Sequence, residues 1–110
     1  MLYRILWLAI LLAPVPVRSA DSAMTAETVI YDGHLHGYFL FIPAAAAQNA
    51  SLLMLLHGSG HDGQSLIDPW KELASHEGII LVAPNAVNPA LWQAGIDGPG
   101  LLVAILDAVR

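Results

Sequence analysis

The chain has 110 residues, with 4 basic and 9 acidic side chains and a formal net charge of −5 at pH 7. A chain of this length forms at most one small domain, and its negative charge argues against binding to nucleic acid or to anionic lipid head groups. Because the sequence has no cysteine, disulfides and thiolate metal sites are excluded.

The first twenty residues form a separate apolar segment. Arg4 precedes an apolar core over residues 5–13, and small or polar residues follow at 17–20. This order is typical of a secretory signal peptide, and the core is shorter than the roughly 20 residues of a membrane-spanning helix. We therefore expect a signal peptide over residues 1–20 and a secreted or periplasmic protein, with an uncleaved membrane anchor as the alternative. The cleavage position stays open between Ser19, Ala20 and Ser22.

A β-hairpin is predicted after a short polar lead-in. Strand-like residues 28–31 and 34–42 flank Asp32-Gly33, a dipeptide that favours tight hairpin turns. Leu35, Phe39 and Phe41 are expected to share one face of the second strand. A loop over residues 44–50 then follows.

A five-residue apolar run over residues 52–56 lacks polar alternation, so it predicts a strand over residues 51–56 that is buried on both faces of a parallel sheet. A glycine-rich loop over residues 57–64 follows it. Ligands of open α/β sheets bind beyond the carboxyl ends of strands, and glycine lets the backbone approach them closely. Backbone N–H groups of this loop are therefore candidates for stabilising a developing oxyanion.

A helix is predicted next, capped by Ser65 or Asp68 and running to about His76. Pro69 would occupy its first position if Asp68 is the cap, and Gly78 would stop it. Its expected apolar stripe consists of Trp70, Leu73 and Ala74.

The remaining segments predict a second buried strand over residues 79–83, a loop with Trp92 over residues 86–97, and a helix over residues 101–109. The strand–helix–strand order implies a right-handed parallel crossover. The apolar side chains of the last helix recur at helical spacing, so we expect this helix to pack on the sheet. Trp92 is expected either in the core or in a substrate cleft.

The sequence His57-Gly58-Ser59-Gly60 resembles the oxyanion-hole loop of serine α/β-hydrolases. Together with Asp68-Pro69-Trp70 and Val82-Ala83-Pro84, it is similar to the N-terminal portion of the branch that includes polyhydroxybutyrate depolymerases, feruloyl esterases and dienelactone hydrolases. The resemblance covers about residues 28–110. It implies that residues 21–110 are the N-terminal part of an α/β-hydrolase fold, a β-hairpin followed by a parallel β-α-β-α unit, truncated before the nucleophile strand.

The resemblance also implies a partial catalytic site. The backbone N–H of Ser59 would donate to the oxyanion, with Gly60 as the second choice, and His57 would be a packing or loop-positioning residue. No serine among the 110 residues lies in a G-x-S-x-G elbow, so the nucleophile, acid and base of the family are expected to be absent from this chain. No catalytic role is assigned to Asp62, Asp68 and Asp97.

The histidines raise a metal hypothesis. His34 and His36 would face one side of a strand, whereas glycines interrupt any helical face shared by His57 and His61. Zinc needs three or four converging ligands, so we expect surface histidines, no metal and no cofactor.

Three functions remain open from the sequence. The first is an exported serine hydrolase that cleaves small-molecule or polymeric carboxylic esters, represented by its N-terminal portion. The second is a catalytically inactive exported remnant or binding module, and the third is a membrane-anchored interaction protein. The strand over residues 51–56 is also expected to leave an open sheet edge, which favours self-association.

Overall fold

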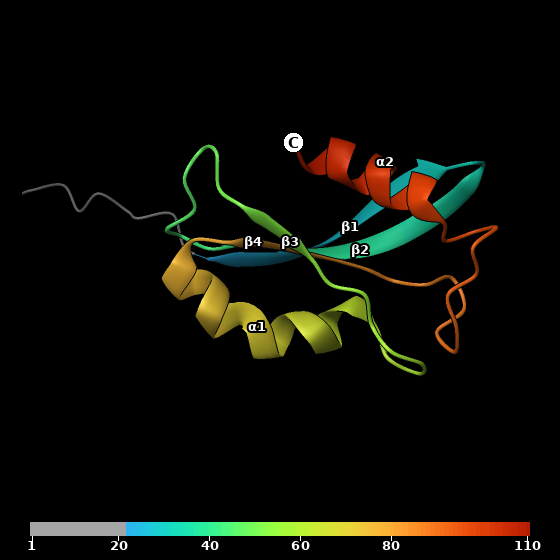
Figure 1. Ribbon diagram of the computed structural model, residues 1–110, viewed down its shortest axis with the longest axis horizontal. Coiled ribbons are helices and arrows are strands. Elements are labelled where there is room, and N and C mark those ends of the chain that lie inside the picture. The colour runs from blue at the N-terminus through green and yellow to red at the C-terminus, as the bar shows by residue number, and fades with distance from the viewer. Residues whose placement is uncertain (1–21) are drawn as a thin grey trace, which may run out of the picture.

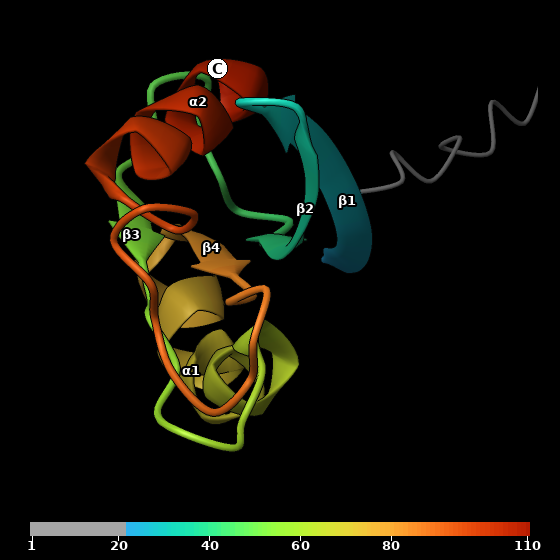
Figure 2. The same cartoon turned by 90° about the vertical axis from the view of Figure 1, so that its right-hand side faces the viewer.

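The computed structural model describes residues 22–110, which form a four-stranded mixed sheet with a helix on each of its two faces (Figures 1 and 2). The elements are β1 (Ala23–Tyr31), β2 (His34–Ile42), β3 (Leu52–Met54), α1 (Gly63–Glu77), β4 (Ile80–Pro84) and α2 (Pro99–Val109). The sheet order is β1-β2-β4-β3, in which only the β3–β4 pair is parallel. The predicted hairpin and parallel β-α-β-α unit are confirmed, and the predicted signal peptide lies outside the described residues.

The hairpin turns at Asp32 and Gly33, as predicted, with φ values of 49° and 75°. β1 begins at Ala23, five residues before the predicted start, because β2 is long enough to pair with it from Ala23 to Tyr31. Leu35 lies on the same side of β2 as Phe39 and Phe41, but it is not buried with them: it is 66% exposed, because the turn end of the hairpin extends beyond α1 (Figure 1).

Helix α1 begins earlier than the sequence predicts. Its N-cap is Asp62, whose carboxylate accepts a hydrogen bond from the Ser65 amide at 2.9 Å, so the caps predicted at Ser65 or Asp68 are wrong. Pro69 consequently lies inside the helix, and the glycine loop ends at Asp62. Gly78 adopts the left-handed conformation with φ 68°, which confirms the predicted stop.

The earlier start also changes which face of α1 is buried. Ile67 and Ala74 are fully buried, whereas Trp70 and Leu73 are exposed, so only one residue of the predicted stripe reaches the core. Gly63, in the first turn, packs so closely on Ala83 of β4 that a Cβ at this position would overlap the Ala83 carbonyl oxygen. The close approach of helix to strand at this glycine fixes the rotation of α1.

Two apolar clusters fill the spaces on either side of the sheet. On the α1 side the buried residues are Phe41, Ile67, Ala74, Leu81 and Ala83. On the α2 side they are Tyr38, Val82, Leu101 and Ile105, which confirms that α2 packs on the sheet. Both clusters draw on β4, which is the most buried strand because it has a neighbour on each edge and a helix on each face.

Neither α1 nor α2, the helices within residues 22–110, is both long and apolar enough for a membrane span.

β3 is three residues long, shorter than the predicted strand over residues 51–56. The Leu55 amide still bonds to the Val82 carbonyl at 2.8 Å, after which the chain leaves the sheet.

Candidate functional site: the loops after β3 and β4

The side chain of His57 joins the loop after β3 to the loop after β4. It is 4% exposed, and its Nε2 accepts a hydrogen bond from the Ala86 amide at 3.0 Å. Its Nδ1 lies 2.8 Å from the Gly58 carbonyl oxygen. Because an amide can only donate, Nε2 must be unprotonated, and we assign the proton to Nδ1, which donates to Gly58. A neutral His57 thus shapes the backbone of residues 57–58, in agreement with its predicted positioning role.

Trp92 forms a second connection to the same loop. Its indole Nε1 donates to the His57 carbonyl oxygen at 2.8 Å, and the two rings lie 4.8 Å apart between centroids. The side chain is half-buried. Trp92 therefore connects the loop after β4 to the loop after β3, and it belongs to neither apolar cluster.

The carboxylate of Asp97 organises the loop after β4. It is buried, and its two oxygens accept hydrogen bonds from the Val87 amide at 3.2 Å and the Gln93 amide at 3.0 Å. Both carboxylate oxygens are thus engaged by backbone amides of this loop. Sequence reasoning missed this role because no local pattern links a carboxylate to an amide ten residues earlier.

The backbone amides of the two candidate oxyanion donors, Ser59 and Gly60, differ in their hydrogen bonding. The Gly60 amide donates to the Pro89 carbonyl at 2.8 Å, and Gly60 has φ 77°, a conformation that favours glycine. Its single N–H is already used, so Gly60 is not free to serve as the second-choice donor in this conformation. Ser59 is exposed, and its amide forms no hydrogen bond with any residue from 22 to 110. Of these two candidates, Ser59 is therefore the one that keeps a backbone donor for a ligand.

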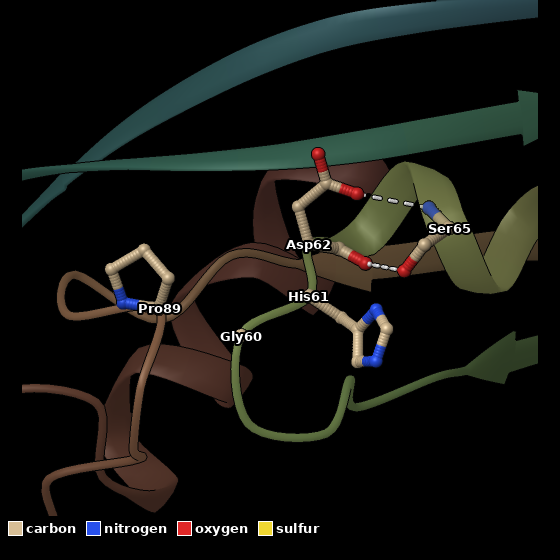
Figure 3. A pocket seen from close by; sticks show the side chains of 5 residues that line it. All are labelled: Gly60, His61, Asp62, Ser65 and Pro89. Atoms are coloured by element: carbon tan, nitrogen blue, oxygen red, sulfur yellow. Dashed lines mark hydrogen bonds between the residues drawn. The ribbon is translucent and has the colours of Figure 1, made fainter.

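A hollow of about 360 Å³ is lined by Gly60, His61, Asp62, Ser65 and Pro89 (Figure 3). Gly60 is thus part of its lining, whereas Ser59, the preceding residue in the chain, is not. The polar groups of Asp62 and Ser65 bond to each other: the Ser65 amide donates to the carboxylate, and the Ser65 hydroxyl donates to the Asp62 carbonyl at 2.6 Å. The Ser65 hydroxyl has a carbonyl rather than a base as its partner, so it is not arranged as a nucleophile.

One of the two histidines of β2 departs from the expectation of surface residues. His34 is exposed, but His36 is 1% exposed and neither of its ring nitrogens has a hydrogen-bond partner among the described residues. Both residues lie on one side of β2 by alternation, and the Tyr31 ring of β1 lies 6.4 Å from the ring of His36 between centroids. Residues 22–110 contain no cluster of three or more histidine, aspartate or glutamate side chains suited to a metal ion.

Solved structures of several hydrolases have a similar fold. LpqC, a poly(3-hydroxybutyrate) depolymerase from Bordetella parapertussis, matches with a TM-score of 0.66 and 13% identity over 82% of this chain and 38% of that one. FphF, a fluorophosphonate-binding serine hydrolase from Staphylococcus aureus, matches with a TM-score of 0.64 and 17% identity over 81% of this chain and 40% of that one. A cold-adapted esterase from an Arctic intertidal metagenomic library matches with a TM-score of 0.55 and 18% identity, covering 84% and 44% respectively.

No protein-family model matches the sequence, and no curated protein matches it. The chain spans about two-fifths of the length of the depolymerase and of the serine hydrolase. At identities this low, the matches establish the fold alone. The chain therefore has the fold of part of an α/β-hydrolase, as the sequence resemblance implied.

Proposed function

We propose that this chain is the N-terminal part of an exported serine hydrolase of carboxylic esters, in which the Ser59 backbone N–H donates to the oxyanion. The observation that carries the proposal is the free Ser59 amide between two fixed neighbours: His57 is bonded to Ala86, and Gly60 is bonded to Pro89. A donor held in place before the reaction stabilises developing charge without the cost of reorganisation.

The mechanism assigns one task to the described residues. When a nucleophile attacks an ester carbonyl, negative charge develops on the carbonyl oxygen, and the Ser59 N–H donates a hydrogen bond to that oxygen and stabilises the charge. One such donor contributes about 3 kcal/mol in well-studied hydrolases. None of the 110 residues forms a G-x-S-x-G elbow, so the nucleophile, acid and base come from outside the printed sequence. The substrate class, a small-molecule or polymeric ester, is supported by the matched depolymerase and esterase.

The first test is chemical. The 110-residue chain is expected to leave p-nitrophenyl esters unhydrolysed and to resist labelling by a fluorophosphonate probe. The polypeptide translated from the gene beyond Arg110 is expected to do both, with the label on a serine in a G-x-S-x-G elbow. Labelling of a serine within residues 1–110 would contradict the proposal, and an inert longer product would favour the catalytically inactive binding module.

The second test isolates the backbone donor in that longer product. Ser59→Pro removes the N–H and is expected to lower kcat about 10²–10³-fold, whereas Ser59→Ala keeps the N–H and is expected to retain the rate. Equal losses in both variants would show that the side chain, not the amide, matters. Gly60→Ala is not a suitable control, because its positive φ strains any other residue.

Export to the periplasm or the medium is tested by mass spectrometry of the N-terminus. The proposal expects a mature N-terminus following Ser19, Ala20 or Ser22. An intact Met1 in the membrane fraction would instead support the membrane-anchored interaction protein.

A further inference from the structure

The loop after β3 takes its position from the loop after β4. Ser59 lies between His57 and Gly60, and both of these neighbours bond to residues of the loop after β4. Four hydrogen bonds join this loop to the loop after β3 and to the start of α1: Ala86 N–H to His57 Nε2 at 3.0 Å, Trp92 Nε1–H to the His57 carbonyl at 2.8 Å, Gly60 N–H to the Pro89 carbonyl at 2.8 Å, and Gly63 N–H to Asn85 Oδ1 at 2.7 Å. Among the described residues, no other segment bonds to residues 57–60. The loop after β4 therefore decides where the Ser59 amide lies.

The buried carboxylate of Asp97 holds both ends of the segment that makes two of these bonds. One oxygen accepts from the Val87 amide at 3.2 Å, and the other accepts from the Gln93 amide at 3.0 Å. Pro89 and Trp92 lie between these two residues in the chain. Hydrogen bonds to a carboxylate are stronger than those between neutral groups, and a buried carboxylate is costly without them. The Pro89 carbonyl and the Trp92 indole are therefore held in place through Asp97.

Asp97 is itself fixed to the packed part of the protein by α2. It immediately precedes Gly98, the N-cap of α2, and a Cβ at Gly98 would overlap the Ala94 carbonyl. Leu101, in the first turn of α2, is fully buried against the sheet. The loop between β4 and α2 has no helix or strand of its own. The carboxylate thus connects a closely packed helix start to a loop that lacks regular structure.

We propose that Asp97 is a positioning residue for the reaction, an inference that rests on the proposed oxyanion role of Ser59. Its carboxylate holds residues 87–93. These residues bond to His57 and Gly60 on either side of Ser59, and so keep the Ser59 N–H in one position before the reaction begins. A donor fixed in advance stabilises developing charge without the cost of reorganisation. Loss of the carboxylate therefore slows the chemical step and leaves substrate binding unchanged.

The first experiment measures amide hydrogen exchange in the full 110-residue chain by NMR. Asp97→Ala is expected to speed exchange at the Gly60 amide by about tenfold relative to the Leu55 amide. Leu55 is the internal reference, because its amide bonds to Val82 in the sheet and a uniform loss of stability would speed both amides alike. Asp97→Asn keeps one acceptor oxygen and is expected to lie between wild type and Asp97→Ala. Asp68→Ala, which removes an exposed carboxylate of α1, is expected to leave the ratio of the two rates unchanged.

The second experiment measures ester hydrolysis by the longer product. Asp97→Ala is expected to lower kcat by up to about 10²-fold with little change in KM, because a small misplacement of a group that acts in the transition state has an effect of this size. Ser59→Pro removes the donor itself, so adding Asp97→Ala to it is expected to cause no further loss. Trp92→Phe keeps an aromatic ring but loses the indole N–H, and it is expected to lower kcat by a smaller factor. A residue that only stabilises the fold would leave the kcat of the folded enzyme unchanged.

Three results would overturn the proposal. They are an unchanged ratio of Gly60 to Leu55 exchange in a folded Asp97→Ala, an effect on KM rather than on kcat, and losses in Asp97→Ala and Ser59→Pro that multiply in the double variant. If Asp97→Ala does not fold, Asp97→Asn and Trp92→Phe supply both comparisons.

The exchange measurement separates this inference from the proposed function. An unchanged exchange ratio together with an impaired Ser59→Pro would refute the role of Asp97 alone. A changed ratio together with a fully active Ser59→Pro would refute the oxyanion role of Ser59 and, with it, the catalytic consequence assigned to Asp97.

Discussion

The imidazole of His57 accepts a hydrogen bond from the backbone amide of Ala86, 29 residues further along the chain, at 3.0 Å. Since the same ring bonds to the Gly58 carbonyl, its two nitrogens connect the loop after β3 to the loop after β4. The position of the free Ser59 amide therefore depends on the His57 side chain.

Replacing His57 tests this connection. His57→Ala leaves the buried Ala86 N–H without a partner and is expected to lower the free energy of unfolding by about 1–3 kcal/mol. It is also expected to speed hydrogen exchange at the Gly60 amide, because the loop that holds Gly60 against Pro89 loses one of its anchors. Urea unfolding and amide exchange measured by NMR check both effects. His61→Ala, at an exposed position in the same loop, is the control.

The tautomer of His57 gives a spectroscopic test. We expect the proton on Nδ1, so long-range ¹H–¹⁵N correlation spectra at neutral pH should show an acceptor-type Nε2. A ring protonated on Nε2 would conflict with the donation from Ala86 and would refute the network.

Gly63→Ala tests the contact that fixes α1. Its Cβ would overlap the carbonyl group of Ala83. This carbonyl belongs to the backbone of β4, so it cannot move aside as a flexible side chain could. We expect a loss of about 1–3 kcal/mol of stability, as for other overpacked sites. Gly95→Ala is the matched control, because nothing lies within 4 Å of its Cβ and its φ is ordinary. Urea midpoints that do not differ between the two variants would contradict the contact.

The N-cap of α1 can be tested against the one predicted from sequence. Asp62→Ala removes the acceptor for the Ser65 amide and is expected to cost about 1 kcal/mol. Asp68→Ala removes only an exposed ion pair with Lys71 and is expected to cost well under about 1 kcal/mol. Thermal or urea unfolding measures both losses. A larger loss of stability in Asp68→Ala than in Asp62→Ala would support Asp68 as the N-cap, as the sequence suggested.

The raised pKa of Tyr38 predicts that the stability of the protein falls at alkaline pH. Burial raises the pKa of its hydroxyl above the ordinary value of 10.0, and the carboxylate of Glu27, opposite it on β1, raises this pKa further. The folded state then holds the proton more tightly than the unfolded state. Its contribution to stability is complete below pH 10.0 and is lost as the pH rises through the folded pKa. Urea midpoints measured across this range should fall more for wild type than for Tyr38→Phe; parallel curves would exclude Tyr38 as the cause.

The sequence alone determined the elements that depend on neighbours along the chain. Asp32-Gly33 set the hairpin turn, Gly78 ended α1, and the apolar run over residues 79–83 predicted β4, because turn conformations and strand burial follow from local chemistry. The glycine loop after His57 could also be recognised from its residues. These local patterns were sufficient for the fold class.

Only the tertiary structure decided the start of α1 and the state of each amide in the loop. The sequence offered Ser65 or Asp68 as the cap and missed Asp62, and the contact of Gly63 with Ala83 sets where α1 lies on the sheet. Ser59 and Gly60 are neighbours in one motif, yet Pro89 occupies the amide of Gly60 and leaves that of Ser59 free. A hydrogen bond across 29 residues carries no local signal, because the partner's position exists only once the two loops are packed together.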